Sequence, residues 1–498
     1  MSGDGFSPVP RHDTLVVVER RDTTDRASRA EVPGESAYPF LFLLLEADRP
    51  LAGGMRIALH DVTEAAIGRG EARSIARHAG SVVIRVPDRR MSHDHARIVR
   101  GAAGRFTIID DGAANGTRIN GGPIVSSVIE DGDVLELGQT LFIYREIAGA
   151  PRRFAGDCDT TQLDELLPGM ATLDPPHAAQ LERLARIAPE PAPLLLLGEP
   201  GTGKELLAAA VHALSGRTGP FVAVHCRAIP PALAESHLFG HVKGALAGAV
   251  RDEMGQVRAA HHGTLFVDEI GDLPPSSQVA LLRVLQEGAV LPVGGARPAK
   301  VDVRVVASSR QPLDELVAAG RVRRDLHARL SGFTHVIPPL RERRVDIGIL
   351  LAALLRGPRV RVPEGLRFRG AAARALVAYD WPNNVRELER CITASIALAE
   401  EGVIRVEDLP AMVAATPSRR WAASAIAAAA SASALAPSPI FADDVRDGAE
   451  LRRELEARLK ETRGNVSEVA RGMGKARHQV QRWLRRFAID PRAYRDGT

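Results

Sequence analysis

Cysteine is scarce in this 498-residue chain, and the few that occur lie far apart. Only Cys158, Cys226 and Cys391 are present, and no CxxC pair occurs. This distribution argues against a disulfide framework or a structural zinc site and suits a reducing compartment. The polar N-terminus lacks a signal-peptide pattern, and the longest early apolar run, Phe40–Leu45, is too short to span a bilayer. We therefore expect a cytoplasmic protein with no membrane partner.

A strong excess of charge of one sign is also missing. The formal net charge is +4, which is too small by itself to predict a nucleic-acid partner. Hydrophobic residues make up 45% and charged residues 25% of the chain, which excludes a wholly disordered, collagen-like or membrane-embedded protein. Because a single core rarely exceeds about 250–300 residues, we expect two to four domains.

Three structured regions are predicted between poorly ordered ones. Residues 1–37 are expected to be a disordered tail, and residues 148–168 and 413–448 to be linkers, the second rich in Ala, Ser and Pro. Residues 38–147 contain short apolar runs separated by turn residues, which predicts an all-β sandwich. Residues 169–412 alternate buried strands and helices, which predicts a parallel α/β domain, and their last part, 341–412, reads as a helical lid.

A glycine-rich segment follows the apolar run Leu194–Leu197 and precedes the helical stretch Glu205–Leu214. It fits the GxxxxGK pattern from Gly198 to Lys204, with Gly201, Thr202 and Gly203 between them. Glycines let backbone N–H groups turn toward phosphates at a helix N-terminus, and Lys204 would reach the outer phosphates. Glu205 stands where the generic motif has Ser or Thr. Such a turn can also be purely structural, so the motif needs a second element.

That second element is the run Thr264–Val267, an apolar strand that ends in Asp268 and Glu269. Asp268 could hold Mg²⁺ and Glu269 could polarise an attacking water, although acids at a strand end can also merely cap a helix. Together the two elements predict a site for ATP and Mg²⁺.

Further motifs give this region a specific resemblance. The segments Gly198–Glu205, Glu235–His241, Gly263–Leu273 and Trp381–Leu388 occur in the order seen in the AAA+ module of sigma-54-dependent transcription activators. The resemblance covers about residues 170–412. In that family Glu normally follows the P-loop lysine, as Glu205 does here.

The resemblance implies roles for several other residues. Glu199 lies beside the P-loop, Ser309 takes the place where sensor I usually has Thr, and Arg386 matches the sensor II arginine. Arg323 and Arg329 match paired arginine fingers that act on a neighbouring subunit, which implies a homo-oligomeric ring, usually a hexamer.

The loop through which this family contacts sigma factor is altered. It usually reads Gly-Ala-Phe-Thr-Gly-Ala, and here Gly244 and Gly248 remain while Leu246 and Ala247 replace Phe and Thr. An aromatic contact contributes about 0.5–1.5 kcal/mol beyond its buried area and a hydrogen bond about 1 kcal/mol. The resemblance therefore predicts an intact ATPase whose coupling to sigma factor is weaker or directed to another partner.

The N-terminal region contains, in order, the motifs Ala66–Arg69, Ser92–Ile98 and Asp110–Gly121. Together they resemble a forkhead-associated (FHA) domain, a reader of phosphothreonine. By that resemblance Arg69 would pair with the phosphate, Ser92 would hydrogen-bond it, and Asn115 would hold the peptide backbone. His95 is usually structural in this fold. Ala113 and Ala114 stand where Ser or Thr is usual, so a domain that folds without binding phosphopeptide stays open.

The C-terminal segment 449–498 is helical and basic, with a net charge of +8 from Leu451 to Arg495. A solvated basic face is the simpler explanation, but Gly464-Asn465-Val466 and a following basic helix resemble a Fis-type helix-turn-helix. The predicted DNA contacts are Arg477, His478, Gln479, Arg482, Arg485 and Arg486, with the last two toward phosphates.

Together the three modules predict a transcriptional regulator whose ring uses ATP to remodel sigma-54 RNA polymerase. DNA would be bound upstream of the promoter, and a phosphothreonine protein would provide the input. One alternative is an FHA-gated DNA-binding regulator that no longer activates this polymerase. Another is an AAA+ remodeller of a different protein, which the helix-turn-helix argues against.

Overall fold

The computed structural model describes residues 37–163, 165, 167–358, 360–415, 452–453, 455–473, 480, 484 and 489–494. The predicted tail 1–37, except residue 37, and the predicted linker 413–448, except its first three residues, lie outside the described residues. No helix in the described part is both long and apolar enough to cross a membrane.

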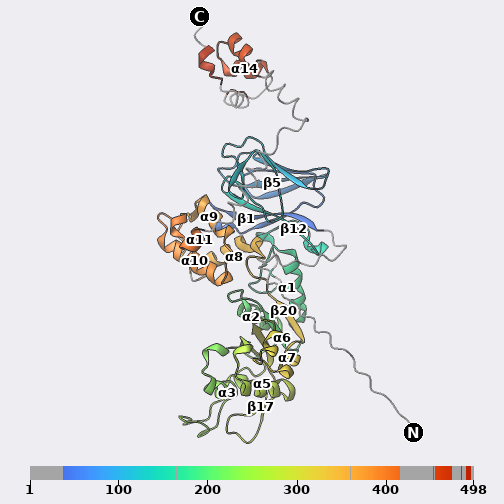
Figure 1. The fold of residues 1–498 in the computed structure, drawn as a ribbon, viewed down its shortest axis with the longest axis vertical. Helices are drawn as coiled ribbons and strands as arrows, with labels where there is room; N and C mark the ends of the chain where they lie inside the picture. The colour runs from blue at the N-terminus through green and yellow to red at the C-terminus, as the bar shows by residue number, and fades with distance from the viewer. Residues whose placement is uncertain are drawn as a thin grey trace, which may run out of the picture.

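Two sheets form a β-sandwich near the N-terminus (Figure 1). One sheet has the order β13 (Cys158–Asp159), β2 (Met55–Ala58), β1 (Tyr38–Glu46), β12 (Thr140–Ile147), β11 (Val134–Leu137), β8 (Thr117–Ile119) and β9 (Gly122–Ile124). The other has the order β10 (Ser126–Val128), β7 (Phe106–Asp110), β6 (Ala96–Arg100), β3 (Glu64–Arg69), β5 (Ser81–Val86) and β4 (Ser74–His78). Side chains such as Leu41, Ile67 and Ile84 fill the space between them.

The next domain is built on a parallel sheet of five strands. Their order is β15 (Phe221–His225), β16 (Thr264–Asp268), β19 (Arg304–Ser309), β14 (Leu194–Leu197) and β20 (Phe333–Val336). The main helices are α1 (Pro175–Ile187), α2 (Lys204–Leu214), α5 (Pro275–Glu287) and α7 (Arg324–Leu330). The register pairs Leu197 with Ser309 and His225 with Asp268, so the carboxyl ends of neighbouring strands meet at one edge.

A smaller helical unit follows. It contains α8 (Ile347–Arg356), α9 (Gly370–Ala378), α10 (Asn384–Leu398) and α11 (Ala411–Ala414). It also contains a short parallel pair, β21 (Arg367–Phe368) and β22 (Val403–Ile404), which the prediction of a purely helical lid missed. The predicted fold class, a β-sandwich followed by an α/β domain and a helical lid, is confirmed.

Residues 148–168 are not the simple linker that their polar composition suggested. They contribute η2 (Arg152–Phe154), β13 and η3 (Thr160–Gln162), and β13 extends the sandwich by pairing with β2. Polar side chains fix this segment because Arg56 donates to the Gly156 carbonyl oxygen (2.9 Å) and Asp157 accepts from the Ala58 amide (2.9 Å). The polarity therefore reflects hydrogen bonds to the sandwich.

Only part of the basic C-terminal segment is described. Helix α14 (Val466–Gly472) follows Gly464 and Asn465, and the Asn465 side chain accepts from the Ser467 amide. The predicted recognition residues, Arg477, His478, Gln479, Arg482, Arg485 and Arg486, all lie outside the described residues, so the helix-turn-helix stays a prediction.

Candidate nucleotide site and binding loops

The glycine-rich loop lies at the carboxyl edge of the parallel sheet, between β14 and α2. Gly201 and Gly203 have φ angles of 77° and 98°, a left-handed conformation that favours glycine. A Cβ on Gly201 would overlap the Asn383 carbonyl oxygen of the lid. Lys204 opens α2, and its buried ammonium donates to the carbonyl oxygens of Gly198 (2.8 Å) and Glu199 (3.3 Å). The loop thus holds its lysine where phosphate oxygens could replace backbone carbonyls.

The two predicted carboxylates, Asp268 and Glu269, lie at the carboxyl end of β16 in the same sheet. Asp268 accepts from the Ser308 hydroxyl (2.6 Å) and lies 3.3 Å from Nδ1 of His225. Glu269 has a left-handed backbone (φ 58°), and its amide donates to the same Ser308 hydroxyl (3.0 Å). Ser308 therefore orients both residues, a role that the sequence did not single out.

Glu269 is held by two cations. One carboxylate oxygen lies 3.4 Å from Nζ of Lys204, and the other accepts from Nε of Arg310 at 3.0 Å. Its side chain is 18% exposed. The residue predicted to polarise water is therefore occupied by ion pairs in this conformation.

Residues of the lid bind the glycine-rich loop directly. Arg341 forms a two-pronged ion pair with Glu199 (2.6 and 2.9 Å), which holds the pKa of that carboxyl below its usual range. The Asn384 amide donates to Glu199 (3.2 Å) and to the Pro200 carbonyl (3.0 Å). The predicted residue Arg386 lies on α10 in the same contact, where its Cβ borders Gly201.

A buried basic cluster lies behind this contact. Arg343 donates to the Thr202 carbonyl (3.3 Å) and lies 3.5 Å from Nε2 of His177. The His177 and His335 rings are 6.5 Å apart. Burial, together with the nearby Arg343 cation, lowers the pKa of His177 to about 3. Burial alone lowers the pKa of His335 to about 4, so both rings are neutral.

Not all predicted nucleotide residues meet at this site. Ser309 is buried, and its hydroxyl donates to the Gln311 carbonyl (2.7 Å), while its own carbonyl accepts from the Gly198 amide. Glu205 is exposed in the first turn of α2. Arg323 immediately precedes α7 and pairs with Asp325. Arg329 lies on α7 and donates to the Leu285 carbonyl oxygen. Both arginines thus bind groups outside the P-loop.

The residues present fit a nucleotide with Mg²⁺. Lys204 is aimed at the backbone carbonyls of the loop, and the two left-handed glycines leave the amides unobstructed by Cβ atoms. Among the described residues no cluster of three or more His, Cys, Asp or Glu side chains could hold a metal ion alone. Mg²⁺ usually binds one or two carboxylates together with substrate phosphates, so Asp268 stays the predicted ligand.

In the sandwich, three loops bring the predicted phosphopeptide residues together. The Arg69 amide donates to the Ser92 carbonyl (2.9 Å), and the Ser92 hydroxyl accepts from the Ala114 amide (3.2 Å). The Asn115 side chain donates to the Arg90 carbonyl (2.7 Å). Arg69 and Asn115 are exposed, so their side chains remain accessible to a ligand.

His95 links two of these loops from below. It is fully buried, accepts from the Ser92 amide at Nδ1 (3.0 Å) and lies 3.2 Å from the Gly116 carbonyl at Nε2. Burial lowers the pKa of His95, and this pattern of partners fits a neutral ring protonated at Nε2. A structural role for His95 follows.

The altered loop lies between α3 (Ala234–Phe239) and α4 (Gln256–Ala259), and α3 lies toward the end of the α/β domain away from the sandwich (Figure 1). The Gly244 amide donates to the Ala249 carbonyl (2.8 Å), and the Ala249 amide to the Leu246 carbonyl (3.0 Å). Ala247 and Gly248 are exposed at its tip. The loop thus presents small apolar side chains to solvent.

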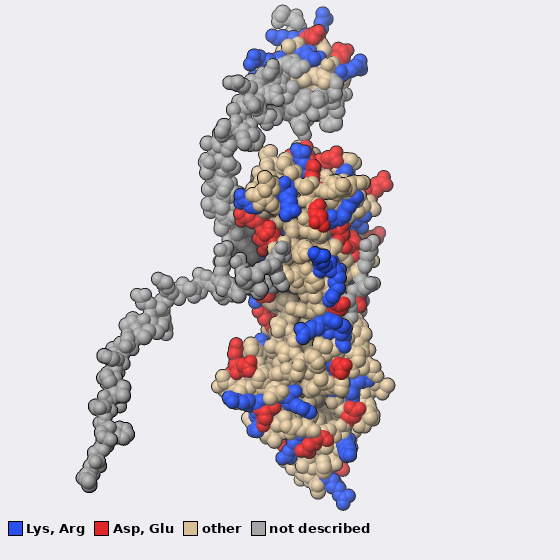
Figure 2. Space-filling model, turned by 90° about the vertical axis from the view of Figure 1, so that its right-hand side faces the viewer, with Lys and Arg blue, Asp and Glu red and all other residues tan. Residues whose placement is uncertain are grey.

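The described surface has no extended patch of one charge on the face shown in Figure 2, where acidic and basic side chains are interspersed.

Sequence reasoning missed several residues around the nucleotide site: Ser308, His225, Arg341, Arg343 and Asn384. A signal for the first two existed, because both lie at carboxyl ends of strands next to β16, where ligand residues of parallel sheets gather.

Comparison with known families assigns three segments. Residues 171–335 match the Sigma-54 interaction domain, residues 341–425 the AAA+ ATPase lid domain, and residues 66–138 the FHA domain.

Individual relatives match part of the chain. The acetoin catabolism regulatory protein of Cupriavidus necator is 42% identical over 326 residues, which cover 64% of this chain and 47% of that protein. The sigma54-dependent transcriptional activator SfnR of Pseudomonas putida is 45% identical over 47% of this chain and 65% of that protein. The chain thus spans about half to two thirds of the curated relatives it matches. Crystal structures of NtrX from Brucella abortus with ADP are 28% identical, cover 63% of this chain and 68% of that one, and give a TM-score of 0.44.

Proposed function

With its Sigma-54 interaction domain, AAA+ lid and FHA domain, the chain belongs with the sigma-54-dependent transcriptional activators, and we propose that it uses ATP hydrolysis to remodel sigma-54 RNA polymerase. The observation that supports this most is the meeting of Lys204, Asp268 and Glu269 at one sheet edge under the lid. We place this activity in the cytoplasm, where transcription takes place in bacteria.

The chain's own residues would divide the work at the nucleotide site. Lys204 would exchange its carbonyl partners for phosphate oxygens. Asp268 would hold Mg²⁺, which neutralises charge on the phosphates when bound. Glu269 would orient the attacking water once its carboxylate leaves Lys204 and Arg310, because these two cations contact both of its oxygens.

Hydrolysis would need a ring of subunits. Arg323 and Arg329 are exposed on or beside α7, and once they leave Asp325 and the Leu285 carbonyl they would reach the nucleotide of a neighbouring subunit and stabilise charge in the transition state. We expect a hexamer. The Arg329→Ala and Lys204→Ala proteins should each lack ATPase activity, and mixing them should restore part of it, because each supplies what the other lacks. No recovery in mixed rings would contradict the trans-acting arginine.

The input and the target DNA would be recognised by the two ends of the chain. Arg69, Ser92 and Asn115 would bind a phosphothreonine protein, and Arg477, His478, Gln479, Arg482, Arg485 and Arg486 an upstream DNA site. Arg482→Ala should weaken the preference among DNA sequences, whereas Arg485→Ala should weaken binding to all of them.

A second candidate function is favoured by the loop at residues 244–249. Leu246 and Ala247 offer neither ring nor hydroxyl to sigma factor, so the chain could be a phosphopeptide-gated DNA-binding regulator that does not activate this polymerase.

The experiment that separates the two functions measures open-complex formation with sigma-54 polymerase, a promoter with its upstream site, and ATP. Wild type and the exposed-lysine control Lys300→Ala should open the promoter, while Glu269→Gln should bind ATP without opening it. ATP turnover without open complexes would favour the second function.

A further inference from the structure

The FHA sandwich and the AAA+ lid share one hydrophobic core. Side chains on one face of β1, Phe40, Phe42 and Leu44, are fully buried with residues of α8, α9 and α10. The alternate side chains, Leu41 and Leu43, belong to the core of the sandwich. Figure 1 shows β1 and β12 beside α8 and α9. Strand β1 is therefore buried on both faces, and the sandwich is fixed to the lid rather than tethered beside it.

Close backbone contacts fix the two units further. A Cβ on Gly348 of α8 would overlap the Leu44 carbonyl oxygen of β1. The Phe368 amide of the lid donates to the Ala47 carbonyl (2.8 Å), and Arg374 binds both oxygens of Glu136 at 2.8 Å. Because these bonds involve backbone and buried groups, the FHA domain is expected to move with the lid as one body.

Arg73 joins the phosphate-binding loop to this interface. It lies four residues after Arg69, its side chain is only 10% exposed, and it pairs with the buried Glu46 and with Asp159 (3.4 Å). It also donates to the carbonyl oxygens of Ala52 and Gly53, both at 2.9 Å, in the turn formed by η1 (Pro50–Ala52). One arginine thus ties the loop that begins at Arg69 to a single turn.

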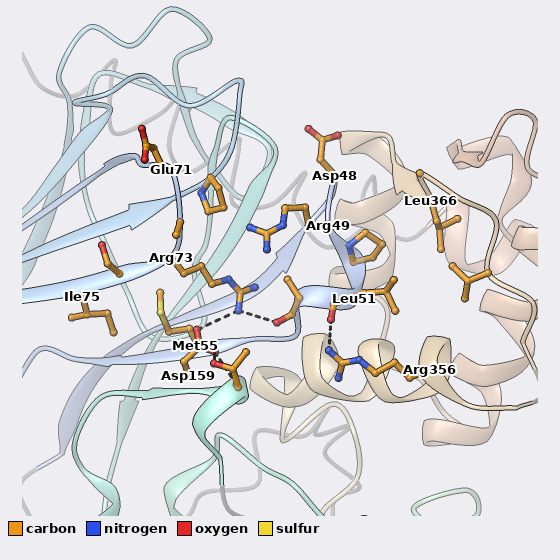
Figure 3. A pocket seen from close by; sticks show the side chains of 18 of the residues that line it. Asp48, Arg49, Leu51, Met55, Glu71, Arg73, Ile75, Asp159, Arg356 and Leu366 are labelled. Atoms are coloured by element: carbon orange, nitrogen blue, oxygen red, sulfur yellow. Dashed lines mark hydrogen bonds and ion pairs between the residues drawn. The ribbon is translucent and has the colours of Figure 1, made fainter.

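The lid holds the same turn from the other side. Arg356, the last residue of α8, donates to the Leu51 carbonyl oxygen (2.6 Å), as Figure 3 shows. A cleft of about 1290 Å³ runs along these contacts, with Glu71 and Pro87 of the sandwich on one side and Glu364 and Leu366 of the lid on the other. The side chains of the turn therefore border open space, so a small displacement of η1 itself need not be blocked by packed atoms.

Helix α8 leads from this turn back to the nucleotide. It follows η7 (Arg344–Asp346), and Arg343 immediately before η7 donates to the Thr202 carbonyl of the P-loop. Residues of the lid also grip Glu199. A change of the P-loop is thus connected through α8 and η1 to the loop that carries Arg69.

We propose that Arg73 is a positioning residue that couples the phosphothreonine-peptide site of the FHA domain to the nucleotide site through η1 and the lid. This inference rests on the proposed function of both sites. Binding at either site then changes the affinity at the other by the same factor, because coupling between two sites is reciprocal. The lid contacts the P-loop directly and reaches the loop after Arg69 through η1 and Arg73, so it is the element whose position both ligands would bias.

The test is hydrogen exchange of the full chain with and without saturating ADP or a slowly hydrolysed ATP analogue. In wild type, nucleotide should slow exchange in the P-loop and also change it at least about threefold in residues 69–75. Arg73→Ala should keep the first effect and lose the second. The matched control is Arg77→Ala: Arg77 pairs with Asp157 and donates to the Ala58 carbonyl within the sandwich, so its loss should leave the coupling intact.

The outcomes separate the two proposals. Protection of the P-loop without any change in residues 69–75 of wild type would overturn the coupling, and so would equal loss of coupling in Arg77→Ala. No protection of the P-loop itself would instead reject nucleotide binding. If Arg73→Ala does not fold, Arg356→Ala replaces it, because Arg356 is exposed and its substitution removes the hydrogen bond from the lid to η1. Full coupling in that variant would overturn the proposed connection through η1.

Discussion

Two loops of the AAA+ domain are each built on two left-handed glycines, but they are held in different ways. In the P-loop, Gly201 stands against the lid, where a Cβ would overlap the Asn383 carbonyl. In the loop at residues 244–249, the positions where Gly244 and Gly248 would carry a Cβ have no neighbouring atom within 4 Å. Its hydrogen bonds run between its own backbone groups. The lid thus constrains the first loop at Gly201, whereas no neighbouring atom constrains the second loop at Gly244 or Gly248.

The difference shows where chemistry can change without loss of fold. An exposed position such as Ala247 can change its side chain at little cost in stability, so a binding partner can decide which residue stands there. In the P-loop a changed backbone would also displace the lid. This agrees with a glycine-rich motif that is complete from Gly198 to Lys204, whereas the loop proposed to contact sigma factor keeps only the glycines and alanines of its motif.

The largest expected effect sets these two loops directly against each other. Gly201→Ala combines left-handed strain of about 1–2 kcal/mol with overpacking of about 1–3 kcal/mol against the lid. We expect nucleotide affinity to fall on the order of 100-fold, measured by titration with a fluorescent ADP. Gly244→Ala carries the strain alone and should leave this affinity unchanged. Equal losses in the two variants would show that the lid contact does not distinguish the loops.

Restoring the missing side chains should come next in size. Leu246→Phe with Ala247→Thr supplies groups that contribute together about 1–2.5 kcal/mol if the sigma surface is the usual one. Open-complex formation should then rise roughly 5- to 50-fold while ATP turnover stays constant. A flat or lower response would mean that the present loop already has a matched partner.

A smaller effect is expected where Arg310 meets the water-activating carboxylate. Arg310→Asn removes one of the two cations on Glu269, so this carboxylate is freer to accept a proton. We expect basal ATPase activity to rise about fivefold, which corresponds to about 1 kcal/mol in the barrier. Arg321→Asn serves as the control, because Arg321 binds Asp272 and not Glu269. A fall in activity would assign Arg310 a supporting role instead.

Much of the local structure follows from short patterns. The apolar run Leu194–Leu197 became β14 with the same bounds, and the expected helix from Glu205 to Leu214 starts one residue earlier, at Lys204. Strand Thr264–Val267 extends by one residue to Asp268. These elements are predictable because burial and glycine turns are encoded by neighbouring residues.

Partners far apart in sequence were not predictable. The run Phe40–Leu45 indicates burial, but nothing in it says that the lid covers its second face. Arg341 and Asn384 reach Glu199 across more than 140 residues, and a polar segment at 148–168 has the same composition whether it pairs with β2 or stays a linker. A single sequence gives composition and spacing, and these do not identify a distant partner.

The smallest effect tests whether the P-loop depends on its buried surroundings through pH. His177 and His335 are neutral in the fold, with pKa values of about 3 and 4, whereas an unfolded histidine titrates near 6.5. A depressed pKa contributes stability that is present above pH 6.5 and is lost as the pH falls toward 4. Between pH 7 and 6 each ring should cost about 0.5 kcal/mol in the free energy of unfolding, measured by urea denaturation. His335→Phe keeps an aromatic ring and should remove about half of this pH dependence of stability, while His78→Phe, at an exposed ring on β4, should leave it unchanged.

The same histidines should also affect nucleotide binding, because Arg343 connects His177 to the Thr202 carbonyl. Nucleotide affinity should weaken over the same pH range by a factor of about two, while hydrogen exchange in residues 244–249 stays constant. If exchange in both loops rose equally with acid, the P-loop would have no special dependence on the buried cluster.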